Sequence, residues 1–222
     1  MADNKRQIFT TPKLRFSYPK LVVADTKFKP EGEYSVKGIG SADDPAVQKL
    51  IALIDKAAAE SLANAKGKAK TPVEAKKWQT KYLPYNPVLD QETGEETGEI
   101  EFKFSSKASG VSAKTGKPWT RKISLFDAKG KPIKDPDIKI GGGTIGKISF
   151  LIQPYAQTPQ TGASVKLALE AAQIIELHSY SGASADSYGF SEEEGFDYEE
   201  GDDEGSSYDS YDNADDTEGA DF

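Results

Sequence analysis

The sequence predicts a mainly β protein, in which a closed antiparallel sheet with one inserted helix is followed by a disordered acidic tail. Short segments recur in which apolar and polar side chains alternate, the period of a strand. Only one long segment follows helical spacing, and no alternation of strands with helices is present. After residue 185 the chain has no Ile, Leu, Val, Met or Pro, so it cannot build a core that offsets chain entropy. We therefore predict a folded domain at 1–185 and a disordered interaction tail at 186–222.

Two predicted strands precede the helix. In TPKLRFSYPKLVVA, Leu14, Phe16 and Tyr18 alternate with polar residues, which predicts that all three side chains face the core. The segment GEYSVKGIG is expected to form the second strand. A helix is predicted over about 45–65, because Asp44 is a favoured N-cap, a proline occupies the first helical position, and apolar residues then follow at helical spacing.

Four further strands are predicted after the helix. They are IEFKFSS, WTRKISLF, a strand at about 145–153, and ASVKLALEAAQIIELHSY. Ala and Leu favour a helix in the last segment, but its alternation over a dozen residues favours a strand. The segment GGGTIGKI resembles a phosphate-binding loop but has Ile148 where such a loop needs Ser or Thr. We interpret it as a glycine hinge that leads into a barrel strand.

Composition excludes several classes of site. The chain has no Cys and a single His, so it offers no disulfide, no thiolate nucleophile and no His-based zinc site, and we expect no cofactor. We see no signal peptide or membrane-length apolar run and expect a soluble cytoplasmic protein. One alternative is a metal-dependent nuclease, in which Asp90 and Glu101 hold Mg²⁺ and Lys103 places a water. The simpler interpretation is a strand whose polar side, with Glu101 and Lys103, faces solvent.

The folded part has 28 basic and 20 acidic residues, a net charge of +8, and its cations are concentrated in two regions. Residues 66–81 contain six lysines and one acid, and residues 102–126 contain six basic residues and no acid. Aromatic residues, Trp78 among them, lie within or beside both regions. Such surfaces bind single-stranded nucleic acid, because cations follow the phosphates and rings stack on the bases. The residues that we expect to contact it are Arg15, Lys20, Lys81, Tyr82, Tyr85, Lys103, Lys107, Trp119, Arg121 and Lys122.

Several of these rings also have an interpretation as core residues. By alternation, Trp119 and Arg121 share one strand face with apolar residues further along the same segment. Phe28 and Phe150, which are outside the candidate set, are expected in the core. A β-bulge, frequent in barrels, would move a ring to the opposite face, so the prediction rests on the region and not on one ring.

The tail has the opposite charge. Residues 186–222 contain 16 acidic residues and no Lys or Arg, and a block of like charge typically serves as an interaction tail. The tail also has seven aromatic residues, ending with Phe222, which argues against a tail for solubility alone. A further alternative is an acidic-tail chaperone or DNA mimic that binds basic partners and never touches DNA.

Together these features resemble phage-encoded single-stranded DNA-binding proteins of the OB fold. The resemblance rests on KLRFSYPKLVVAD, the helix after the second strand, GASVKLALEAAQIIEL, and the acidic tail that ends in Asp221 and Phe222. It implies an OB-fold barrel and a non-enzymatic role in phage DNA replication and recombination in the host cytoplasm. It also implies that the tail competes with DNA for one groove and that Asp221 and Phe222 recruit a polymerase, helicase or primase. A homo-oligomer is compatible with it, since the tail can act on its own chain or on a neighbour.

Overall fold

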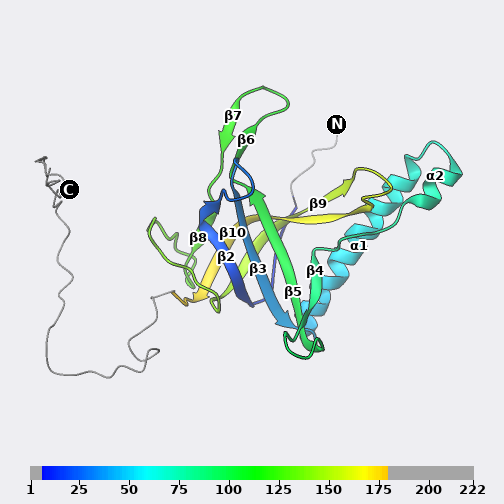
Figure 1. Cartoon of the computed structure of the whole chain (residues 1–222). Helices are drawn as coiled ribbons and strands as arrows, with labels where there is room; N and C mark the ends of the chain where they lie inside the picture. The colour runs from blue at the N-terminus through cyan, green and yellow to red at the C-terminus, as the bar shows by residue number, and fades with distance from the viewer. Residues whose placement is uncertain (1–6, 180–222) are drawn as a thin grey trace, which may run out of the picture. The chain divides into compact units, whose positions relative to one another are not determined.

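The strands form an eight-stranded sheet that closes into a barrel (Figure 1), which confirms the mainly β prediction. The computed structural model describes residues 7–179, so the predicted tail at 186–222 lies outside the described residues. Five strands close the ring, because β9 pairs with both β2 and β10 while the path β2-β3-β5-β10 joins them. Their bounds are β2 Leu14–Asp25, β3 Glu33–Ser41, β5 Glu96–Lys107, β9 Ile145–Ala156 and β10 Ala163–Glu176.

One junction of the ring departs from the predicted antiparallel pattern. β10 runs parallel to β5, with Leu167 beside Phe104 and Ala168 beside Ser105. The reason is geometric: five strands cannot alternate direction all the way around a closed ring, so one neighbouring pair must run parallel. A parallel pair needs a crossover connection instead of a hairpin, and here the connection includes β9.

The remaining strands extend the barrel or leave it. β1 (Ile8–Thr10) pairs with β9, and β4 (Tyr85–Leu89) pairs with β5. β6 (Ser109–Val111) and β7 (Pro118–Thr120) form a separate hairpin that projects at one end of the barrel (Figure 1). The segment WTRKISLF was predicted as one strand, but it divides between β7 and β8 (Ser124–Phe126), which pairs with β10.

The predicted helix is α1, Pro45–Gly67, and its first turn is capped by Asp44, which accepts a hydrogen bond from the Ala46 amide at 2.8 Å. A second helix, α2 (Pro72–Lys77), was missed by the sequence analysis. Its signal is a capping box, because Thr71 accepts a hydrogen bond from the Glu74 amide at 3.1 Å. Within residues 7–179, neither helix is long and apolar enough to cross a membrane.

The core lies inside the barrel and beneath α1. Phe16, Phe102, Phe104 and Phe150 are fully buried, and the Phe104 and Phe150 rings meet edge to face at 5.3 Å. The core predictions for Phe16 and Phe150 are therefore confirmed. The predictions for two other rings are wrong, because Tyr18 is 76% exposed and Phe28 is 83% exposed.

The glycine-rich segment follows the hinge interpretation. Gly146 lies where β9 pairs with both β2 and β10, opposite Leu14 on one side and Ile174 on the other. A Cβ atom at Gly146 would press against the Gln173 carbonyl oxygen and lie 2.6 Å from the Phe16 ring. Only glycine fits at this crossing, and the residues that follow are a strand, so the segment is not a phosphate-binding loop.

Candidate nucleic-acid interface

Side chains that point away from the barrel core on β2, β3, β5 and β10 form a surface that we call the cationic face. Its members alternate with buried residues along each strand, so they share the outer side of the sheet. Lys37 of β3 pairs in register with Ser17 of β2 and with Lys103 of β5, which places these residues in one row across the sheet. The cations of this face are Arg15, Lys20, Lys37, Lys103, Lys107 and Lys166.

Carboxylates hold most of these cations in place. Arg15 Nη2 donates to both carboxylate oxygens of Glu99, at 2.7 and 2.9 Å, and the Lys37 ammonium lies 3.0 Å from Glu101. Further pairs are Lys107–Glu31 at 3.3 Å and Lys166–Glu33 at 3.5 Å. Among residues 7–179, Lys20 and Lys103 have no carboxylate oxygen within 4.0 Å. Two cations are therefore open to an incoming anion, and the others must exchange a carboxylate for it.

Glu33 stays ionised despite its partial burial. Burial raises the pKa of Glu33, but hydrogen bonds from Lys29 and Ser105 and the charge of Lys166 outweigh that effect and lower the pKa. The pKa of Glu31 is lowered as well, first by a backbone hydrogen bond and then by Lys107. These carboxylates thus remain negative at neutral pH and compete with phosphate for the lysines.

Trp119 does not lie in the core, although alternation along the sequence placed it on the same strand face as Ile123 and Leu125. It sits on β7 and is 38% exposed, and its ring packs against Gly110 of β6, where a Cβ atom would lie 2.8 Å from the ring. Arg121, just after β7, reaches Ser106 and Glu170 at 3.3 Å each. The physical reason is the break between β7 and β8, which interrupts the alternation at residues 121–123.

The turn between β2 and β3 lies against the base of the β6–β7 hairpin. The Ala108 amide donates to the Gly32 carbonyl at 2.9 Å, and the Ser109 hydroxyl donates to the Glu31 carbonyl at 2.8 Å. The turn carries the exposed Phe28, with the Lys27 ammonium 5.4 Å from its ring centroid. One end of the barrel therefore presents two rings and several lysines beside the cationic face.

The structure separates a second group of predicted residues from this face. Lys81 donates to the Gln160 carbonyl at 3.0 Å, so Lys81 and the exposed Tyr82 lie beside the turn between β9 and β10. Tyr85 lies between α1 and β5, where it packs on Phe102 at 5.9 Å and donates to Asp55 at 2.8 Å. Lys122 is exposed between β7 and β8.

Packing on Phe102 and a hydrogen bond to Asp55 hold the Tyr85 side chain in place. Burial first, and then the hydrogen bond and charge of Asp55, raise the pKa of Tyr85 to about 12. A half-buried ring that bridges a helix and a strand has little surface left for a base.

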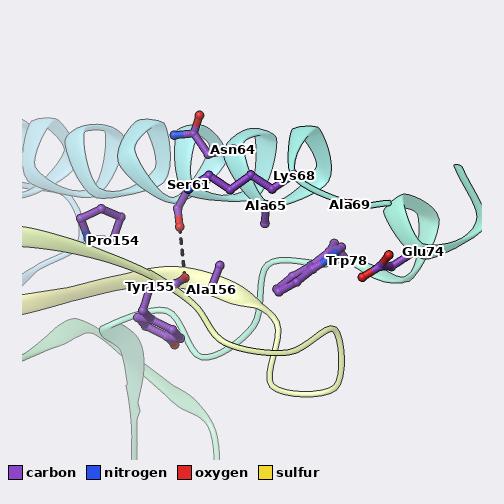
Figure 2. A pocket seen from close by; sticks show the side chains of 10 residues that line it. All are labelled: Ser61, Asn64, Ala65, Lys68, Ala69, Glu74, Trp78, Pro154, Tyr155 and Ala156. Carbon is purple, nitrogen blue, oxygen red and sulfur yellow. Dashed lines mark hydrogen bonds between the residues drawn. The ribbon is translucent and has the colours of Figure 1, made fainter. Parts of the chain in front are cut away.

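Trp78 is buried too, although it lies in a lysine-rich segment. It lines a pocket of about 300 Å³ between α1, α2 and β9 (Figure 2), where Ser61 donates to the Tyr155 carbonyl at 3.1 Å. The indole nitrogen has no hydrogen-bond partner among the described residues. This ring belongs to the packing of the helical end and not to the cationic face.

The residues of the nuclease alternative do not come together. Asp90 caps its own turn, since its carboxylate accepts from the amides of Thr93 and Glu92, and these hydrogen bonds lower its pKa. Glu101 pairs in register with Asn86, and Asp90 is four residues further along, about 13 Å at strand spacing. Within residues 7–179 no three acidic or His side chains are grouped to hold a metal ion.

Sequence reasoning missed Tyr18, Phe28, Lys37 and Lys166. Lys37 and Lys166 were detectable, because each alternates with buried residues on its strand. The turn signal KPEG after Phe28 indicates that this ring lies at a strand end. Tyr18 had no local signal, since its exposure depends on how β2 pairs with β3.

Comparison with known proteins agrees with this geometry. The family model of the single-stranded DNA-binding protein of bacteriophage T7 matches residues 16–177. The chain is 30% identical over 206 residues to the single-stranded DNA-binding protein of Enterobacteria phage T3, covering 88% of this chain and 87% of that protein. The crystal structure of gp2.5, a single-stranded DNA-binding protein encoded by bacteriophage T7, superposes with a TM-score of 0.66 at 28% identity, over 87% of this chain and 99% of that one.

A more distant structure shares the fold. The single-stranded DNA-binding protein from bacteriophage Enc34, solved in complex with single-stranded DNA, has a TM-score of 0.50 at 15% identity, over 80% of this chain and 91% of that one. With the family model covering most of the barrel, the chain belongs to the family of the single-stranded DNA-binding protein of bacteriophage T7.

Proposed function

We propose that this protein coats single-stranded DNA, without strong sequence preference, during phage DNA replication and recombination in the host cytoplasm. The observation that supports the proposal is the cationic face, on which four strands direct lysines and arginine to one side beside exposed rings. Every DNA sequence offers the same phosphates, and every base offers a face for stacking. The family is non-enzymatic, so binding is the activity.

Binding on this face is an exchange of anions. Phosphates reach Lys20 and Lys103 directly, whereas at Arg15, Lys37 and Lys107 they replace a carboxylate that already pairs with the cation. Such exposed pairs contribute at most about 1 kcal/mol each, so a phosphate displaces them at little cost. The carboxylates keep the cations ordered and reduce their attraction for DNA at the same time.

The test is a fluorescence titration with labelled oligo(dT) at several salt concentrations. We expect the logarithm of the affinity to fall with the logarithm of the salt concentration, by about 0.7 for each phosphate neutralised. Lys103→Ala should weaken binding and reduce that slope by about 0.7, whereas Lys49→Ala, on the exposed side of α1, should change neither. An affinity that is insensitive to salt would refute the proposal.

We propose further that the acidic tail competes with DNA for the cationic face. Its 16 acids are tethered to a domain of net charge +8, so their local concentration at the lysines is high. A protein ending at residue 185 should therefore bind oligo(dT) more tightly than the full chain. If this truncated protein fails to bind DNA at all, the chaperone or DNA-mimic alternative gains the support instead.

The last residues of the tail have a separate proposed role. We propose that Asp221 and Phe222 anchor the tail on a replication polymerase, helicase or primase, because a ring adds specificity to a charge that is otherwise generic. Deleting Phe222 should leave the affinity for oligo(dT) unchanged and weaken the pull-down of the polymerase. An unchanged pull-down would show that the acids alone make the contact.

A further inference from the structure

Tyr18 is moved out of the core by one extra residue in β2. The pairing of β2 with β3 steps from Ser17 opposite Lys37 to Lys20 opposite Ser35. This step takes three residues on β2 and two on β3, so β2 contains a β-bulge there. The bulge breaks the alternation that would place Tyr18 beside the buried Phe16, and the ring turns out to solvent.

The conformation of Tyr18 is costly. Its φ is +47°, in the left-handed region, where a residue other than glycine is disfavoured by about 1–2 kcal/mol. Pro19 follows, and a residue before proline prefers an extended backbone, which adds to the cost. The ring is 76% exposed, so burial of the ring does not offset this strain. Backbone strain of this kind is concentrated at functional sites, where the surrounding structure holds it in place.

The surroundings of the ring fit a nucleic acid. The Lys37 ammonium lies 5.7 Å from the Tyr18 ring centroid, and Lys37 pairs in register with Lys103. Lys20, two residues along β2, is exposed and has no carboxylate within 4.0 Å among the described residues. An exposed aromatic ring close to cations is the arrangement that binds a base and its neighbouring phosphates.

We propose that Tyr18 is a base-stacking platform, held outward by the β-bulge, on which one base of single-stranded DNA stacks while Lys20, Lys37 and Lys103 bind the adjoining phosphates. The inference rests on the proposed function and assigns it a specific contact. Stacking tolerates any base, so the platform adds affinity without sequence preference.

The test compares Tyr18→Leu with Tyr18→Phe in the full chain by titration with oligo(dT). Leucine keeps an apolar side chain and removes the ring, whereas phenylalanine keeps the ring. Base stacking on an aromatic residue contributes about 5-fold to 150-fold in affinity, so Tyr18→Leu should bind at least about 5-fold more weakly and Tyr18→Phe should bind like the wild type. The salt slope of Tyr18→Leu should equal that of the wild type, because no charge is lost.

Two controls separate the possible failures. Lys103→Ala should lower the salt slope, which Tyr18→Leu should not do. Urea unfolding should show that Tyr18→Leu is folded. In Tyr18→Trp, oligo(dT) should quench the tryptophan fluorescence more strongly than it does in the wild type, because the added ring stacks on a base. If Tyr18→Leu binds like the wild type while Lys103→Ala binds weakly, the platform is wrong and the proposed function stands. If the wild type does not bind oligo(dT), the proposed function itself fails.

Discussion

Removal of the Glu101 carboxylate charge should strengthen DNA binding. Glu101 lies on β5 two residues from Lys103, and its carboxylate is 3.0 Å from the Lys37 ammonium. In Glu101→Gln, Lys37 is released for a phosphate, and a negative charge next to the path of the DNA disappears. Neither effect requires a change in the barrel, since the Glu101 side chain points away from the core.

The expected magnitude follows from the exposure of the pair. The side chains of Lys37 and Glu101 are 38% and 25% exposed, so their interaction is partly screened by water and salt. An exposed pair of this kind contributes about 0.5–1 kcal/mol, which corresponds to about a two-fold to five-fold gain in affinity at low salt. The salt slope should stay close to that of the wild type, because Lys37 binds a phosphate in both proteins.

The assay is the oligo(dT) titration over a range of salt concentrations, with Glu96→Gln as the matched control. Glu96 is an exposed residue at the start of the same strand, outside the pairs of the cationic face. Glu96→Gln makes the same change in net charge, so a difference between the two variants reports on position. The reasoning is refuted if Glu101→Gln binds no more tightly than Glu96→Gln.

Two further predictions concern the barrel. Gly146→Ala should lower the free energy of unfolding in urea by about 1–3 kcal/mol, because its Cβ would meet the backbone and the Phe16 ring. Gly142→Ala should have little effect, because there is open space around Gly142. Equal unfolding midpoints for the two variants would contradict the close packing described at Gly146. Tyr85 should titrate at about 12, above its ordinary pKa of 10, so its contribution to stability is complete below pH 10 and is lost as the pH rises through about 12. Tyr85→Phe should remove that step from the absorbance titration near 295 nm, and an unchanged titration curve would contradict it.

Local signals predicted the elements whose causes are local. Asp44 caps α1 as predicted, because an N-cap acts on amides two or three residues away. The strand assignment of β10 is confirmed against its helical propensity, since alternation of apolar and polar residues reflects a strand with one side more buried than the other. The parallel pairing of β5 with β10 was not predicted, because it depends on how many strands close the ring.

The predicted site divides in the same way. Lys103 and Lys107 face outward from β5, where alternation with Phe102 and Phe104 determines their direction. Tyr85 was predicted to bind DNA, but its position depends on α1, which packs over β5 and supplies Asp55. Tertiary packing decides which side of a short edge strand stays open, and the sequence of that strand does not contain this information.

Three rings for which the sequence analysis gave an interpretation as core residues have one property in common. Alternation placed Tyr18 on a core face and offered the core as an alternative for Trp119, and Phe28 was expected in the core; all three rings are exposed, at the cationic face or the adjoining hairpins. A fold that left rings outside by accident would scatter them over the surface, and the local rules would fail at unrelated places. Natural sequences depart from local rules mainly where function requires it. The failures of the sequence pattern therefore identify the same surface as the lysines do, by an independent route.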